Sequence, residues 1–314
     1  GHASSLWTPF IHKSYCKYRF NCLCISNQSV NLRYAKHMSD IASLLKQATS
    51  ECGGGLPRVD AEFLLSHYLN KPRSWLYAHS DFQLKPEQEI EFQGLIYRRQ
   101  KGEPVAYITG RRGFWSFDLH VTPDTLIPRP ETELLVELAI ERVALNSESN
   151  VLDLGTGSGS IALAIAKECP KAKVVAVDYS ELALDVARKN ATELQVRNLE
   201  IVRSNWFDAL EEKRFDVIAS NPPYIELNDA HLTQGDLRFE PISALASGQD
   251  GLDDIRIIIS GAKNHLTPNA WLLIEHGWNQ AESIRQLFID AGYVDVSTEQ
   301  DLALRDRVTM GRMQ

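Results

Sequence analysis

Hydrophobic and polar positions follow two different patterns along this chain, and the change of pattern divides it. From residue 131 onward, apolar runs of about five residues take turns with longer amphipathic stretches. Short apolar runs indicate buried strands, and apolar residues every three or four positions indicate helices. Strands that alternate with helices predict an α/β unit with a mostly parallel, Rossmann-like sheet covered on both faces.

The elements expected in this unit, 131–314, can be read directly from the pattern. The expected strands are 150–155, 173–178, 199–204, 215–220, 270–277, 294–298 and 307–312. The expected helices are 133–145, 160–168, 181–194, 252–264 and 279–291.

The first part of the chain has a helical pattern only. Within residues 38–104, short amphipathic runs follow Pro57, Pro72 and Pro86, and glycines follow the run at 41–48. Proline in a first helical turn and glycine after a last one are typical helix boundaries. We therefore predict a small helical domain over 38–104. Residues 105–130 (VAYITG, FWSFDLHV, TLIP) are aromatic or β-branched and predict a β-hairpin linker.

Composition limits the class of protein. The chain has 314 residues, 44% hydrophobic and 24% charged, as in ordinary globular proteins. No apolar run approaches the roughly 18 residues of a membrane span, so we expect no membrane segment. A net charge of −8 argues against a broad basic surface, and we predict no direct, sequence-specific nucleic acid binding.

Residues 1–37 differ from the rest in charge. They hold five basic residues and no acidic one, together with Cys16, Cys22 and Cys24. The segment starts with Gly, and Met38 resembles a natural start. A targeting leader and a non-native, vector-derived tail both remain open, and we leave the segment out of the fold. Because the cysteines show neither zinc-ligand spacing nor a disulfide framework, we expect no metal and a cytoplasmic location.

A glycine-rich turn follows the first strand of the α/β unit. The sequence VLDLGTGSGS, 151–160, places glycines at 155, 157 and 159, where the backbone can turn sharply and approach a ligand. The pattern G-S-G-S-I-A from Gly157 also fits a dinucleotide site, and a plain structural turn is a third interpretation. Asp178, which ends the next strand, can hold the ribose hydroxyls of any nucleoside-containing cofactor that binds here.

Asp153 decides between a dinucleotide and S-adenosylmethionine as the cofactor. A carboxylate beside a pyrophosphate is unfavourable, whereas it attracts the sulfonium and ammonium groups of S-adenosylmethionine. The pattern D-x-G-x-G-x-G, followed by an acid at the next strand end, resembles the first two motifs of class I methyltransferases. The resemblance implies that S-adenosylmethionine is the cofactor and S-adenosylhomocysteine its product.

The run SNPPYIE follows the buried strand FDVIA. Pro222 and Pro223 cannot donate backbone hydrogen bonds and they fix φ, so this strand tip is stiff. In a sheet of this winding the tip lies beside the glycine turn, which would direct Asn221 at the methyl group. The run Asn221 to Tyr224 resembles the (N/D)PPY motif of methyltransferases that act on planar nitrogens; a simple strand terminator is the alternative.

This residue set suits an amide or amine nitrogen. Such a nitrogen is a poor nucleophile because its lone pair is delocalised. The Asn221 side-chain oxygen and the Pro222 carbonyl could hold both of its hydrogens and aim the lone pair at the methyl group, while Tyr224 stacks on the planar group. We therefore predict Asn221, Pro222 and Tyr224 as catalytic, and Pro223 with them as substrate-binding.

Further motifs narrow the family. GEPVAYITG (102–110), TLIPRPETE (125–133) and FEPISALASGQDGL (239–252) resemble the peptide-chain release factor glutamine methyltransferases, over about 39–314. The resemblance implies methylation of the glutamine side-chain amide in the Gly-Gly-Gln motif of release factors, by a monomer whose helical domain recognises the protein substrate. Methylation of a ribosomal-protein glutamine or of a nucleic acid adenine, and a non-catalytic binding module, remain as alternatives.

The resemblance also implies a set of cofactor-binding residues. They are Asp153, Gly155, Thr156, Gly157, Gly159, Asp178, Tyr179, Asn205, Trp206, Phe207, Asn221 and Phe114. Trp206 would border the adenine, and Asn205 stands where the family often has an acid. Phe114 and Trp115 would close the site, or instead form hairpin core.

Three further residues have open roles. Arg129 and Glu131 could join the hairpin to the site or form structural ion pairs. His276, at the end of a strand near the cleft, could be a general base or a packed histidine, and the mechanism above does not need it.

Overall fold

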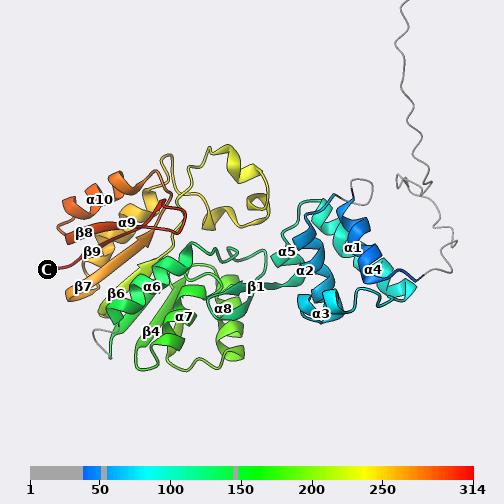
Figure 1. The fold of residues 1–314 in the computed structure, drawn as a ribbon. Helices are drawn as coiled ribbons and strands as arrows, with labels where there is room; N and C mark the ends of the chain where they lie inside the picture. Colours follow the sequence, from blue (N-terminus) through cyan, green and yellow to red (C-terminus); the bar gives the residue numbers. More distant parts are fainter. Residues whose placement is uncertain (1–37, 51–54, 144–147) are drawn as a thin grey trace, which may run out of the picture.

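The computed structural model describes residues 38–50, 55–143 and 148–314. The interpretations of residues 1–37, and of the glycines and cysteine at 52–54, lie outside these ranges. Figure 1 shows a small helical unit and a larger unit built on a sheet, with the hairpin strand β1 between them. Within the described ranges, no helix combines the length and the apolar character that a membrane crossing requires.

The helical unit has a core of its own. Its helices are α1 (Ile41–Thr49), α2 (Arg58–Leu69), α3 (Arg73–Ala78), α4 (Pro86–Gln100) and α5 (Val105–Thr109). Leu44, Leu64 and Phe92 lie at the centre of their shared apolar cluster. Pro57 and Pro72 occupy the N-caps of α2 and α3, and Pro86 opens α4, as the prolines predicted.

The predicted hairpin is shorter than expected. Strands β1 (Arg111–Phe114) and β2 (Phe117–His120) pair in antiparallel fashion, but VAYIT forms helix α5 and residues 121–131 form no strand. Pro104 at the N-cap and left-handed Gly110 at the C-cap bound α5. The strand prediction for 105–109 was wrong because consecutive residues are buried: Ile108 packs in the helical unit, and Ala106 and Tyr107 pack against the linker at Val121 and Ile127, which hides any helical period.

The larger unit is a seven-stranded sheet. Its strands are β3 (Asn150–Leu154), β4 (Lys173–Asp178), β5 (Leu199–Arg203), β6 (Phe215–Ser220), β7 (Leu266–Glu275), β8 (Val294–Gln300) and β9 (Asp306–Arg312). Their order is β5-β4-β3-β6-β7-β9-β8, and only the pairs that include β9 are antiparallel. The predicted mostly parallel α/β sheet is confirmed.

Helices cover both faces of this sheet. They are α6 (Thr132–Val143), α7 (Ser160–Glu168), α8 (Glu181–Glu193), α9 (Asp253–Ala262) and α10 (Ala281–Asp290). Alternate strand residues enter two clusters: Val151 packs with α6 and α7, and Leu152 packs with α9 and α10. Because β3, β4, β6 and β7 run parallel, their carboxyl ends meet at one edge of the sheet, where the candidate residues lie.

A long segment between β6 and α9 extends from this edge to the helical unit (Figure 1). It contains the short 3-10 helices η1 (Ala230–Thr233), η2 (Leu237–Phe239) and η3 (Ile242–Ala244). Asp236 pairs with Arg99 of α4 at 3.0 Å, and Arg238 donates to the Lys101 carbonyl at 2.6 Å. The segment thus ties the helical unit to the edge of the sheet.

Candidate active site

The glycine turn closes around the end of β3. Gly155, Gly157 and Gly159 all have positive φ, of 73°, 55° and 86°. The amides of Gly155 and Thr156 both donate to the Val177 carbonyl of β4 at 2.9 Å. At Gly159 a Cβ would lie 3.3 Å from the Ala187 Cβ, so glycine lets α8 approach the turn. The backbone of this turn is thereby held against β4 and α8.

Asp153 lies beneath this turn and not on its ligand side. The side chain is fully buried; one carboxylate oxygen accepts from the Thr156 hydroxyl at 2.6 Å and from the Ala162 amide at 3.1 Å. The other oxygen has no hydrogen-bond partner among the residues described here. Burial raises the pKa of Asp153 to about 7, which the two hydrogen bonds partly oppose.

This placement corrects two of the predicted contacts. A carboxylate without exposed surface cannot touch a bound sulfonium directly, and the Thr156 hydroxyl is engaged with it. Both side chains shape the turn from below. Their charge and hydrogen bonds reach a ligand only through the backbone that they support.

Asp178, the last residue of β4, contacts the glycine turn. Its carboxylate accepts from the amides of Gly157 and Ser180, each at 2.9 Å. Burial raises its pKa, and the backbone hydrogen bonds oppose that shift. Next to it, Tyr179 is 68% exposed, with the Arg203 guanidinium 5.7 Å from its ring. The structure brings Asp178, Tyr179 and the glycine turn together.

Trp206 covers the first glycine. A Cβ on Gly155 would lie 3.6 Å from the indole, so the ring rests on the bare backbone there. Trp206 has a φ of 47°, and its carbonyl accepts from the Ser204 hydroxyl at 2.8 Å. Asn205 is exposed, and its amide nitrogen donates to Asp208 at 3.2 Å. The indole and the turn form a flat apolar wall beside Asp178.

Phe207 and Phe114, two predicted cofactor contacts, pack among the apolar side chains on the two faces of the sheet. The Phe207 ring stacks on His265 at 4.8 Å, against α9. Phe114 is 3% exposed within the α6–α7 cluster, and the Trp115 indole donates to Glu168 at 2.8 Å. Glu168 ends α7, eight residues and ~12 Å beyond its start at the glycine turn. The Phe114 ring therefore belongs to the core, while the Trp115 amide donates to Glu133, next to Thr132, at 2.8 Å; that the hairpin closes the site stays a prediction.

The strand tip at Asn221 adjoins the glycine turn. In the β3–β6 pair, Leu154 is opposite Ser220, and the Ser220 hydroxyl donates to the Leu154 carbonyl at 2.8 Å. Gly155 and Asn221 are the residues that directly follow this last paired position. The Asn221 amide nitrogen donates to the Thr132 hydroxyl oxygen at 3.2 Å. The amide oxygen is thereby turned away from Thr132.

The rest of the tip is held on both sides. Pro222 is buried, and Pro223 and Tyr224 are half-buried. The Tyr224 amide donates to the Leu245 carbonyl at 3.2 Å, and its carbonyl accepts from Gln280 at 3.0 Å. Burial raises the pKa of the Tyr224 hydroxyl, so this ring stays neutral. These hydrogen bonds add to the fixed φ of the two prolines in holding the backbone of the tip.

Glu275 is the last residue of β7 and His276 follows it, and their buried side chains have different partners. Glu275 is 1% exposed and accepts a hydrogen bond from the Thr132 side chain. His276 is fully buried, with its ring nitrogens 2.9 Å from the Gly277 carbonyl and 2.8 Å from the Thr309 hydroxyl. Burial lowers the pKa of His276 to about 4. Of the two interpretations of His276, the packed histidine fits these contacts and the general base does not.

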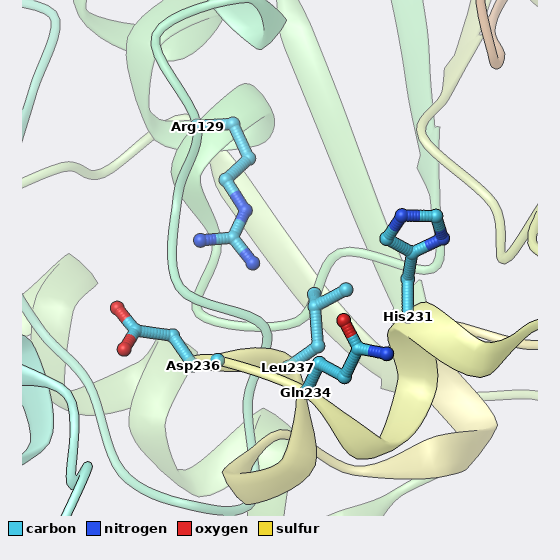
Figure 2. Close-up of a pocket in the computed structure, with 6 residues that line it drawn as sticks. Arg129, His231, Gln234, Asp236 and Leu237 are labelled. Atoms are coloured by element: carbon cyan, nitrogen blue, oxygen red, sulfur yellow. The ribbon is translucent and has the colours of Figure 1, made fainter.

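Arg129 is paired, yet it faces an open space. Its guanidinium hydrogen-bonds Glu240, which is buried and also accepts from the Ile127 amide at 2.9 Å. Glu131 is exposed. An open pocket of about 500 Å³ is lined by Arg129, His231, Gln234, Gly235, Asp236 and Leu237. Figure 2 shows this pocket in close-up. Arg129 thus pairs with Glu240 at the border of this pocket, three residues before Thr132 along the chain.

Sequence reasoning missed residues that act through long-range hydrogen bonds. Thr132 links α6 to the tip at Asn221. Asn190 of α8 is 1% exposed and joins the glycine turn to the hairpin, donating to the carbonyls of Ser158 at 2.9 Å and His120 at 3.0 Å. A polar residue on an otherwise apolar helix face was the available signal for Asn190. No cluster of three or more potential metal ligands occurs in the described ranges.

Comparison with known proteins identifies related chains. A family model described as "Methyltransferase small domain" matches residues 131–236, and one described as "PrmC N-terminal domain" matches 41–110. The catalytic domain of hMettl16 has a TM-score of 0.52 at 13% identity, over 73% of this chain and 83% of that one. At that identity the likeness concerns the fold alone.

Two curated relatives carry the same name, release factor glutamine methyltransferase. The protein of Xylella fastidiosa (strain Temecula1) is 53% identical over 86% of this chain and 97% of its own length. The protein of Escherichia coli (strain K12) is 48% identical over 82% of this chain and 92% of its own. With the class I methyltransferase sheet, the glycine turn and the N-P-P-Y tip side by side, this chain belongs to the release factor glutamine methyltransferase family.

Proposed function

We propose that this protein transfers a methyl group from S-adenosylmethionine to the side-chain amide nitrogen of the glutamine in the Gly-Gly-Gln motif of peptide-chain release factors. The observation that supports the proposal is the pairing of Leu154 of β3 with Ser220 of β6, because Gly155 and Asn221 directly follow these two residues. The names of the curated relatives supply the substrate class.

The residues at the edge fit this cofactor. The glycine turn admits a ligand close to its backbone, Asp178 offers a carboxylate for ribose hydroxyls, and the Trp206 indole offers an apolar face for an adenine. Tyr179 and the amide oxygen of Asn205 complete the rim. When bound, S-adenosylmethionine supplies an electrophilic methyl group, and S-adenosylhomocysteine is left.

The chain's own part is to position a weak nucleophile. The Asn221 oxygen and the Pro222 carbonyl accept the two amide hydrogens of the substrate glutamine, and Tyr224 packs on the planar amide. With both hydrogens held, the nitrogen lone pair can leave the amide plane and point at the methyl carbon. The N–CH₃ bond forms as the S–CH₃ bond breaks, and one N–H proton then leaves to solvent. Placement of this kind accounts for several kcal/mol of a barrier.

The helical unit would select the protein substrate, because one glutamine offers too little surface for recognition. The segment 230–244, fixed to that unit by Arg99 and Asp236, borders the pocket at Arg129 and would line the approach. If so, intact release factor has a kcat/KM at least 100-fold above that of a short Gly-Gly-Gln peptide. Equal values for the two would remove this role. We place the reaction in the cytoplasm, with a monomer as the working unit.

The deciding experiment supplies radiolabelled S-adenosylmethionine with purified release factor, ribosomes or DNA in parallel. We expect label in the release factor, and mass spectrometry should place one added methyl group on the motif glutamine. Label in a ribosomal protein or in DNA would move the activity to another planar nitrogen. Cofactor binding without transfer to any of the three would leave a binding module.

A further inference from the structure

The amide of Asn221 must face one way for the proposed reaction. An asparagine side chain has an acceptor oxygen and a donor nitrogen of nearly equal shape. Only the oxygen can accept a hydrogen from the substrate amide; the nitrogen would meet that amide donor to donor. Nothing in the N-P-P-Y run itself decides between the two orientations, so some other group has to do so.

The structure provides such a group in Thr132. Its hydroxyl oxygen accepts from the Asn221 amide nitrogen at 3.2 Å. Asn221 and Glu275 directly follow the paired residues Ser220 and Ile274, so the buried Glu275 carboxylate lies close by and takes the Thr132 hydroxyl hydrogen. A carboxylate only accepts, so it draws the threonine hydrogen to itself and presents the threonine lone pairs to Asn221. This order of donors and acceptors fixes the asparagine nitrogen toward Thr132 and its oxygen toward the site.

Glu275 is otherwise hard to explain. It is 1% exposed at the end of β7, and its second carboxylate oxygen has no hydrogen-bond partner within the described residues. Burying a carboxylate is costly, and most buried carboxylates receive several hydrogen bonds. This one receives its side-chain hydrogen bond from Thr132. A purely structural position would be served by a glutamine or an apolar residue without that cost.

We propose that Thr132 and Glu275 are positioning residues that hold the Asn221 amide in its reactive orientation, an inference that rests on the proposed function. Neither touches the substrate. They act through Asn221: Glu275 orders the Thr132 hydroxyl, and Thr132 orders the amide. The fraction of enzyme with the correct amide orientation then scales the catalytic rate.

Charge couples this relay to pH. Burial raises the pKa of Glu275 to about 7, and the Thr132 hydrogen bond opposes the shift. The charged and titratable groups that face it are Arg307 of β9, Arg129 and Glu131 before α6, and Tyr224 after β6. Once protonated, Glu275 can donate a hydrogen to Thr132, which frees the threonine to donate to the asparagine oxygen. The catalytic rate should therefore rise as the pH increases through about 7.

The test measures single-turnover methyl transfer to intact release factor at saturating cofactor, with the full chain. Thr132→Val removes the hydroxyl at constant shape and should lower the rate about tenfold, the value of one orienting hydrogen bond. Thr132→Ser restores the hydroxyl and should recover most of that loss. The dissociation constant of S-adenosylmethionine should stay within twofold in both variants, and Thr125→Val, a buried threonine of the linker, controls for stability.

The pH profile separates an orienting role from a structural one. Wild type should show the rise near pH 7, whereas Glu275→Gln should be slower and flat between pH 6 and 8, because an amide neither titrates nor forces Thr132 to donate. An unchanged rate in Thr132→Val, equal losses in the Val and Ser variants, or a rise that persists in Glu275→Gln would each overturn the inference. Failure of wild type to methylate release factor would instead refute the proposed function.

Discussion

Asp153 and Glu275 make an informative comparison because they share nearly everything except their neighbours. Each is one of the last two residues of a strand at the same edge of the sheet, is almost fully buried and has one oxygen without a partner among the described residues. In each case burial raises the pKa to about 7. Each also accepts a hydrogen bond from a threonine hydroxyl.

What differs is the group that the threonine belongs to. Thr156 is part of the glycine turn, and Asp153 also accepts from the Ala162 amide at the start of α7, so this carboxylate holds a backbone. Thr132 opens α6 and contacts the Asn221 side chain, so Glu275 orders a side chain. A backbone cradle serves binding, and an oriented amide serves the chemical step. The comparison predicts that Asp153 affects cofactor affinity and Glu275 affects rate.

The largest expected effect is at Asn221, because the proposed effect of Glu275 on the rate acts only through this residue. Asn221→Ala removes the acceptor for the substrate amide and should lower kcat by about 10²–10³-fold, the usual effect of losing one preorganised hydrogen-bonding group. The dissociation constant of S-adenosylmethionine, measured by calorimetry, should change less than threefold. Loss of cofactor binding as well would mean that Asn221 also supports the glycine turn. The groups that serve cofactor binding and those that serve the chemical step would then no longer be separate.

The second effect is on stability and should be common to both carboxylates. The Glu275 pKa is raised from 4.5 to about 7 in the folded protein, so the fold binds more protons than the unfolded chain between these values. Its contribution to stability is full below pH 4.5 and is lost as the pH rises through 7. Relative to Glu275→Gln, which does not titrate, the wild-type unfolding free energy should fall by about 2–3 kcal/mol from pH 5 to 8.

Asp153→Asn should behave in the same way, and exposed Glu137→Gln is the matched control with a constant difference from wild type. Urea unfolding followed by circular dichroism at several pH values measures all four proteins. A wild-type curve parallel to that of Glu275→Gln would mean that Glu275 is already ionised at pH 5.

The parts of the candidate site that the sequence predicted consist of residues that are adjacent in the chain. The glycine turn and the tip 221–224 are continuous runs at strand ends, and parallel strand order brings such ends together. The Thr132–Glu275 contact joins residues 143 positions apart, from a helix start and a strand end, and no local pattern signals it. The packing of Phe207 and Phe114 could not be predicted for the same reason, since an aromatic residue next to a motif packs wherever the tertiary contacts favour it.

The third prediction tests the Asp153 side directly. Asp153→Asn keeps the shape but weakens two hydrogen bonds from charged-acceptor to neutral strength, a loss of about 1 kcal/mol. The dissociation constant of S-adenosylmethionine at pH 8 should rise about five- to tenfold, while kcat at saturating cofactor falls less than threefold. Glu275→Gln should show the reverse, a lower kcat at unchanged affinity. If both variants lower kcat alone, the division of roles between the two carboxylates is wrong.

The smallest expected effect is at His276, which directly follows Glu275 yet faces the other side of β7. Its pKa of about 4 keeps the ring neutral from pH 5 upward, so it cannot produce a rise in rate near pH 7. His276→Gln should lower the melting temperature, because the ring hydrogen-bonds Thr309 and the Gly277 carbonyl in the core. Below that temperature kcat should change less than threefold, and the rise near pH 7 should remain. A flat profile in this variant would assign the titration to His276 and return the histidine to the chemistry, leaving Glu275 as a buried structural acid.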